Sequence, residues 1–213
     1  MALKEVTLEL TQGDSEDYLI TVKDDAPTPA PINLSQAVDG TVDRPAIVRF
    51  AVKKDPASES NEEAIVFKSS YFPDQISFLP QSGGTLGQCR ALVDKPDTQD
   101  VEAGAYRWDI EVTRQDALRS GAQAGTISVS SGSVVVAGTG TAFDKAKPGD
   151  VLQPLGVLNT APVKILKVVS PSSVEVEAPV FQTEAGISFE VRRGKHKTAG
   201  RGPFTLVQSV VSE

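Results

Sequence analysis

Hydrophobic and polar side chains alternate most regularly in Gly-Ala-Tyr-Arg-Trp-Asp-Ile-Glu-Val-Thr, at positions 104–113. The apolar members of this alternation are Tyr106, Trp108, Ile110 and Val112. Successive side chains of a strand point to opposite faces, so the pattern predicts a half-buried strand. Its apolar face carries the chain's single Trp, whose large ring anchors much buried area. Trp108 is therefore expected to lie in a core and not in a binding site.

Similar short alternations recur through the first half of the chain, separated by segments rich in Pro, Gly and acidic residues. They predict strands around Val6–Leu10, Tyr18–Val22, Ile47–Val52, Ala64–Lys68, Gln75–Leu79 and Gln88–Val93. Short strands at this spacing, with turn residues between them, are typical of a β-sandwich. The best helix candidate, Thr113–Ser120, is too short for more than a turn, and Lys53–Glu63 is expected to be a mobile loop. The predicted fold class is all-β.

The amino-acid composition of the chain changes after Gly121, where Val, Ser, Thr and Gly dominate. The elements become shorter, and strands are expected at Thr126–Val129, Val134–Ala137, Val151–Leu155, Val163–Val169 and Val174–Glu177, with Phe189 and Val191 finishing the segment. Turn residues such as Pro148-Gly149-Asp150 separate them. Residues 121–197 therefore predict a second, smaller β module, expected to be a compact barrel.

The last stretch returns to the first pattern, with Phe204, Leu206 and Val210 alternating after a Gly-Arg-Gly-Pro turn. If residues 121–197 are removed on paper, this strand forms an antiparallel hairpin with the Trp108 strand. We therefore predict a discontinuous sandwich domain, 1–120 plus 198–213, with the module 121–197 inserted before its last strand. Lengthening a loop costs only about 0.6 kcal/mol per doubling, so such an insertion is thermodynamically cheap. The alternative is two sequential domains followed by a C-terminal tail.

Charge and composition narrow the classes of partner. The net charge of -7 argues against nucleic acid, and no apolar run approaches the roughly 20 residues of a membrane helix. The first ten residues carry charges where a signal peptide would be apolar, so a cytoplasmic site of synthesis is expected. Residues 122–195 carry seven Lys/Arg and six Asp/Glu, so the negative charge belongs to the flanking domain.

Residues with catalytic or metal-binding chemistry are sparse. Cys89, the single cysteine, lies in an alternating stretch and is expected to be a small buried hydrophobe, an intermolecular disulfide being the alternative. The single histidine, His196, lies in a basic run that is expected to be a solvated loop between the domains. A Ser-His-Asp site would need a histidine held in a fixed orientation, and a solvated loop between two domains does not hold a side chain in this way. With one His and one Cys, no zinc site is expected.

Carboxylate groups offer two weak calcium candidates, Asp97 with Asp100 and Asp14 with Glu16 and Asp17. Neither has the spacing of an EF-hand, so exposed acidic loops are expected and no metal or cofactor is predicted. Gly138 and Gly140 are not followed by the helix that a phosphate site needs, so they are expected to serve backbone freedom.

A basic cluster spans the predicted crossing and comprises Arg192, Arg193, Lys195, Lys197 and Arg201. It has no interleaved aromatic residues, which nucleic-acid sites use for stacking. We expect it to dock within the chain or onto the acidic loops Glu59–Glu63 or Asp94–Glu102 of another copy.

Three motifs of the first domain carry a family resemblance: Ile20-Thr21-Val22-Lys23-Asp24, Ile32-Asn33-Leu34 and Gly104 to Val112. They resemble the immunoglobulin-like N-terminal domain of tailed-phage baseplate upper proteins. The inserted module is similar to small β repeats of phage tail, fibre and neck proteins. Its matching residues are Gly125 to Val129, Gly138-Thr139-Gly140-Thr141-Ala142-Phe143 and Pro148 to Leu152.

The resemblance implies an immunoglobulin-like sandwich and a non-enzymatic structural part of a phage virion, assembled in the host bacterial cytoplasm. It implies a homo-oligomeric connector of the neck or collar, or of the baseplate or tail-fibre attachment region. The implied partners are copies of itself and other phage structural proteins: portal or connector, tail, fibre or baseplate proteins. It carries no catalytic residues. The alternatives are a carbohydrate-binding or host-recognition module and, behind it, an enzyme dependent on His196.

Overall fold

The structure is a computed structural model of the 213-residue chain, and it describes residues 8–11, 14–24, 26–54, 64–158, 161–177 and 182–208. The chain is all-β, as predicted, with antiparallel sheets in a sandwich-like arrangement. It divides into two compact units. The sandwich unit comprises Met1–Leu34, Val48–Val112 and His196–Glu213, and the second unit comprises Ser35–Ile47 and Thr113–Lys195.

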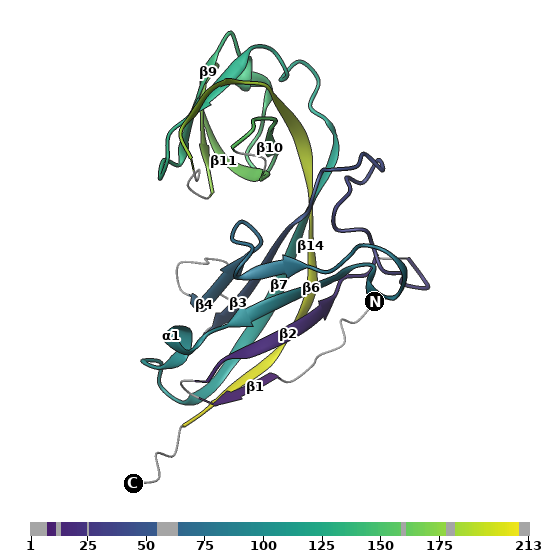
Figure 1. Cartoon of the computed structure of the whole chain (residues 1–213), viewed down its shortest axis with the longest axis vertical. Helices are drawn as coiled ribbons and strands as arrows, with labels where there is room; N and C mark the ends of the chain where they lie inside the picture. The colour runs from purple at the N-terminus through teal and green to yellow at the C-terminus, as the bar shows by residue number, and fades with distance from the viewer. Residues whose placement is uncertain are drawn as a thin grey trace. The chain divides into compact units, whose positions relative to one another are not determined.

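The sandwich unit has two layers of strands. One layer has the order β2-β6-β5, and the other has the order β14-β7-β3-β4, with β1 pairing parallel to β14 (Figure 1). The bounds of its elements are β1 Leu8–Thr11, β2 Glu16–Thr21, β3 Ile47–Lys53, β4 Ala64–Ser69, β5 Ile76–Phe78, the 3-10 turn Gly83–Thr85, β6 Gln88–Val93, α1 Lys95–Thr98, β7 Gly104–Leu118 and β14 Phe189–Val207. The last two strands continue into the second unit.

Aromatic residues fill the space between the two layers. Phe50 on β3 is fully buried and stacks on Tyr18 of β2 and Trp108 of β7, at ring-centroid distances of 5.8 and 6.4 Å. Trp108 itself is 6% exposed, so its expected place in the core is confirmed. Full burial of one such side chain contributes about 2–3 kcal/mol, which makes this cluster a main source of the unit's stability.

The terminal strand and the Trp108 strand are hydrogen-bonded neighbours, since β14 and β7 are adjacent in the sheet. Phe204 and Leu206 of β14 are buried in the core, as their alternation predicts. Val6 and Val210, which belong to the predicted first and last strands, lie outside the described residues, as does most of the predicted loop Lys53–Glu63.

The second unit is a curled sheet with the order β13-β8-β9-β12-β11-β10-β14. Its further elements are β8 Thr126–Val129, β9 Val135–Thr139, the 3-10 turn Phe143–Lys145, β10 Val151–Pro154, β11 Val163–Ser170, β12 Ser173–Val176 and β13 Glu184–Ile187. Only Ser188 separates β13 from β14, yet β13 pairs with β8 and β14 pairs with β10. The two ends of the curled sheet are thus consecutive in the chain. Phe143 and Phe189 meet inside it, with ring centroids 5.4 Å apart.

Two sequence predictions about local structure are wrong. The turn expected at Thr113–Ser120 is the continuation of β7, which runs to Leu118. The buried positions shift by one residue there, because Thr113 is buried directly after Val112 and the next buried residue is Gln115. Since these two side chains are polar, the hydrophobic pattern ends before the strand does. The basic run Arg192–Arg201, expected to be a loop, lies wholly within the 19-residue strand β14.

The compact units also differ from the predicted boundaries at 120 and 198. The segments Ser35–Ile47 and 113–120, predicted to belong to the sandwich, cluster with the second unit. Backbone contacts explain this assignment, because the Val38 amide donates to the Gln115 carbonyl at 2.7 Å. The side chain of Gln115 donates to the Pro45 carbonyl at 3.1 Å.

Candidate functional site

Cys89 and His196, the single cysteine and the single histidine of the chain, lie in different environments. Cys89 is fully buried on β6, as expected, and burial raises the pKa of its thiol to about 12. His196 is exposed on the strand β14 and not on a loop between domains. Thus the thiol is shielded within the sandwich, and the imidazole faces solvent from a regular strand.

Two of the carboxylates considered for calcium, Asp97 and Asp17, bind other groups of the chain. Asp97 accepts the Asp94 amide at 2.6 Å in a capping box at the start of α1, and pairs with Lys68 Nζ at 2.6 Å. Lys68 is only 5% exposed, so this ion pair neutralises a buried cation. Asp17 pairs with Arg90 at 3.9 Å on the surface. Within the described residues there is no group of three or more His, Cys, Asp or Glu arranged to hold a metal ion.

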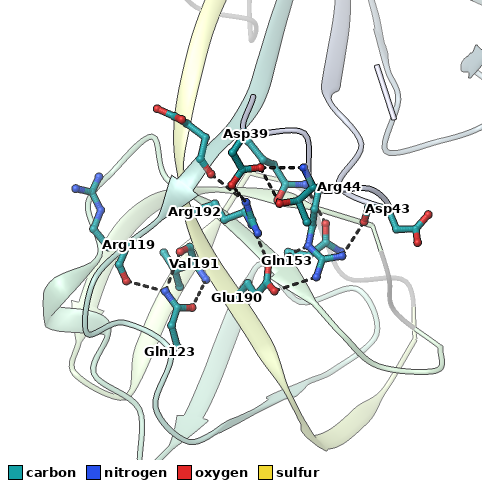
Figure 2. A network of polar contacts seen from close by, with 12 residues as sticks. Asp39, Asp43, Arg44, Arg119, Gln123, Gln153, Glu190, Val191 and Arg192 are labelled. Carbon is teal, nitrogen blue, oxygen red and sulfur yellow. Dashed lines mark hydrogen bonds and ion pairs between the residues drawn. The ribbon is translucent and has the colours of Figure 1, made fainter. Parts of the chain in front are cut away.

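A polar cluster surrounds Glu190 in the second unit. Arg44 donates to its carboxylate through two nitrogens, Nε to Oε2 at 2.8 Å and Nη2 to Oε1 at 2.9 Å. Arg192 adds a third bond from Nε to Oε2 at 2.8 Å. Figure 2 shows these side chains converging from the segment 35–47 and from β14. The donors from the two guanidinium groups lower the pKa of Glu190 to about 2.

Arg192 continues the cluster toward Asp39. Its Nη1 donates to Asp39 Oδ2 at 3.1 Å and to the Asp116 carbonyl at 3.3 Å, and its side chain is 4% exposed. The Thr41 hydroxyl and amide bind the other Asp39 oxygen at 2.7 and 3.0 Å. Thr41, followed by Arg192, holds the pKa of Asp39 at about 2. Arg192, the first residue of the predicted basic docking cluster, is therefore buried inside the second unit and binds within the chain, which is one of the two alternatives expected for that cluster.

The backbone positions Arg44 for this contact. Asp43 has φ 56°, in the left-handed region that residues other than Gly rarely occupy, and its carbonyl accepts Arg44 Nη1 at 2.9 Å. Asp tolerates this conformation better than most residues do. The local bend and the side-chain contact together direct Arg44 to Glu190.

Further polar pairs bind neighbouring strands in the same unit. Arg119 forms two hydrogen bonds to the buried carboxylate of Asp150, the longer of them 2.8 Å from Nε to Oδ2. The Gln123 side chain accepts the Val191 amide at 2.9 Å and donates to its carbonyl at 3.0 Å, as a strand neighbour would (Figure 2). Gln115 donates to Gln153 Oε1 at 3.0 Å in full burial. These pairs hold segments distant in sequence and point to a structural role for the cluster.

A pocket of about 240 Å³ lies between the two layers of the sandwich unit. It is lined mainly by apolar side chains, among them Leu8, Tyr18, Leu19, Ile20, Phe50 and Trp108. Leu19 is 59% exposed, whereas the inner wall is formed by the buried Phe50 and Trp108. The Tyr18 hydroxyl donates to the Glu9 carbonyl at 3.3 Å and links β2 to β1 beside the pocket.

A second surface feature follows β10, where the chain leaves the curled sheet of the second unit. Leu155, Val157 and Leu158 are 42%, 92% and 52% exposed. The Glu184 carboxylate accepts the amides of Val157 at 2.8 Å and of Leu158 at 3.3 Å. We call residues 155–158 the apolar loop. Leu155 was expected to end the preceding strand, whereas β10 ends at Pro154. The sequence holds no local sign of the contact between the loop and Glu184.

Within the described ranges, no helix has the length and hydrophobicity needed to span a membrane. Comparison with known proteins adds no identity, because the chain matches no family model and no curated protein.

Proposed function

We propose that this chain is a non-enzymatic structural component of a tailed bacteriophage virion, a connector in the neck or collar or in the baseplate or tail-fibre attachment region. The motifs that resemble phage proteins support the proposal. Gly104 to Val112 forms the core strand β7, and Gly125 to Val129 leads into and forms β8 of the second unit. These two motifs thus lie in the framework of their units.

The observation that carries the proposal is the way in which the two units share one chain. The chain passes between them four times, after Leu34, Ile47, Val112 and Lys195. Two of these passages occur inside the continuous strands β7 and β14. A binding module appended to a scaffold needs only one linker, whereas four covalent connections suit a part that holds other components together.

The ion pairs of three acidic residues agree with a structural role. Glu190, Asp39 and Asp97 each bind a cationic side chain and at least one further donor within the chain. Such pairs hold segments in place when all their bonds are made. We therefore assign these acids to the framework and place function on the surface, in contacts with copies of the chain and with other virion proteins.

Localisation in particles tests the proposal. Antibodies against the purified chain, used for immunogold electron microscopy of purified phage particles, are expected to label one end of the tail. Peptides of the chain are expected in the same particles by mass spectrometry. Presence in the infected-cell lysate together with absence from purified particles would exclude the proposal.

The alternative, a carbohydrate-binding or host-recognition module, has one observation in its favour. Three aromatic residues, Tyr18, Phe50 and Trp108, line the pocket of the sandwich unit. Against it, Phe50 and Trp108 are 0% and 6% exposed, whereas sugar sites present open aromatic faces. Specific binding on a glycan array, lost in Tyr18→Ala, would favour this alternative over the connector.

A further inference from the structure

The apolar loop has an unusual combination of exposure and fixed backbone. Val157 exposes 92% of its surface, and Leu158 next to it exposes 52%. In a loop where exposed apolar residues have no role, we would not expect a side chain to bind two consecutive backbone amides. Here both oxygens of Glu184 do so. Adjacent exposed apolar residues can mark a contact site. Here the backbone that carries them is also held in place.

Gly156 shows how closely the loop fits Glu184. A Cβ atom on Gly156 would lie 2.4 Å from Glu184 Oε2 and 2.6 Å from Oε1. These distances are far inside van der Waals contact, so a side chain at position 156 would displace the carboxylate from the place where it accepts the two following amides. The sequence thus fixes the Val157 and Leu158 backbone while leaving their side chains in solvent.

The pocket of the sandwich unit has the size and chemistry to receive these side chains. Its volume of about 240 Å³ exceeds that of an apolar cavity of about 150 Å³ that holds a benzene molecule. Its lining includes the half-buried Tyr18 together with the buried Phe50 and Trp108, and Leu19 is an exposed apolar residue at its border. An aliphatic knob of one or two side chains is therefore the kind of group it fits.

Charge favours a contact between unlike units over one between like units. The sandwich unit carries eleven Lys/Arg against nineteen Asp/Glu, and the second unit carries ten against nine. Two sandwich units brought together would repel each other, since each has a net charge of -8. A second unit, at +1, meets no such barrier.

We propose that the apolar loop of one copy inserts Val157 and Leu158 into the Tyr18–Phe50–Trp108 pocket of a second copy. This deepens the proposed function, because it names the contact by which the connector would assemble with itself. The contact is heterologous, joining different surfaces on the two copies. Repetition of such a contact builds a ring where the rotation closes and an open chain where it does not.

Sedimentation velocity over a wide concentration range tests the proposal on the full chain. We expect the wild type to associate as its concentration rises. Val157→Asp is expected to raise the dissociation constant about tenfold or more, because it places a charge in an apolar contact. Leu19→Glu is expected to do the same from the pocket side, and both residues are exposed, so the fold is retained.

Two matched variants control for the added charge. Val169→Asp changes a residue that is 54% exposed on β11, and Leu118→Glu changes one that is 46% exposed on β7. Both are expected to associate like the wild type. Circular dichroism and thermal melting check that all four variants are folded. Equal loss of association in a test variant and its control would contradict a specific contact.

Mixing the two test variants gives the sharpest result. Val157→Asp keeps an intact pocket and Leu19→Glu keeps an intact loop, so an equimolar mixture is expected to form a heterodimer although each alone stays monomeric. A contact between two loops or two pockets cannot be restored in this way. The proposal is overturned by a monomeric wild type, by a Val157→Asp or Leu19→Glu variant that associates normally, or by a mixture that remains monomeric.

Failure here and failure of the proposed function are distinguishable. Particle labelling reports on the virion, whereas sedimentation reports on contacts between copies in solution. A chain that labels particles but stays monomeric would remain a connector that binds only other proteins. A chain that self-associates and is absent from particles would keep the contact and lose the virion role.

Discussion

Gly200 on β14 lies against the indole of Trp108 on β7, so closely that a Cβ atom at position 200 would be 3.0 Å from Cη2 and Cζ3 of the ring. The two residues belong to neighbouring strands that are separated by most of the second unit in the sequence. Glycine at this position gives the large ring its place in the sandwich core.

Gly200→Ala is expected to destabilise the protein, because the added methyl group must displace the Trp108 ring, which is only 6% exposed. Overpacking of a core costs about 1–3 kcal/mol, which a urea unfolding curve resolves. Gly84→Ala is the control, since nothing lies within 4 Å of its Cβ position. Equal stability of Gly200→Ala and the wild type would show that the ring moves freely.

The cluster around Glu190 predicts a pH dependence of stability. Two arginines lower the pKa of Glu190 from 4.5 to about 2, so its contribution is complete above pH 4.5 and is lost as the pH falls toward 2. Glu190→Gln is expected to cost about 2 kcal/mol at neutral pH, because charge-assisted hydrogen bonds are lost. Its free energy of unfolding should then fall less steeply than that of the wild type between these two pH values. Parallel curves would contradict the assignment.

The ion pair between Lys68 and Asp97 predicts non-additive mutations. Asp97→Asn leaves the buried Lys68 without its anion and is expected to cost roughly 3 kcal/mol. The double variant Lys68→Met, Asp97→Asn removes the stranded charge and should recover a good part of that loss. Thermal unfolding of the single and double variants completes the cycle. Additive losses would mean that the two side chains act independently.

Cys89 predicts a thiol that is protected in the folded chain. It is fully buried and its pKa is raised to about 12, so little thiolate forms near neutral pH. An aromatic disulfide reagent is expected to react roughly a hundredfold or more slowly with the native protein than with the unfolded protein, since reaction requires opening. A fast reaction in the native state, or a dimer on a non-reducing gel, would show an accessible thiol.

Alternation of side chains predicts much of the fold, because a strand with one buried face has apolar residues at every second position. The bounds of β6 and β8 agree with their predictions, since their inward positions are apolar. This pattern does not predict the end of β7, because the buried residues there are the polar Thr113 and Gln115. It also fails for β13, a four-residue strand whose pairing with β8 is irregular and which contains Gly186 at φ 68°.

The polar cluster and the contact between the apolar loop and Glu184 could not be predicted from local sequence patterns, for a different reason. Arg44 and Glu190 are 146 positions apart, and each is an ordinary charged residue in its own neighbourhood. Glu184 binds amides that lie 26 and 27 positions earlier. Such contacts depend on three-dimensional placement alone. The run Leu155-Gly156-Val157-Leu158 places apolar residues directly after a proline, but this pattern does not identify Glu184 as their partner.

The division of the sandwich unit over the chain has a consequence for synthesis. Its sheet needs the part of β14 from residue 196 onward, which the ribosome makes only after the 83 residues 113–195. At about 5–20 residues per second, the β7 edge waits roughly 4–17 s for its neighbour. During that time one edge of the strand that carries Trp108 has no neighbour and can pair with other nascent chains. Expression yield should therefore depend on how quickly translation reaches the last strand.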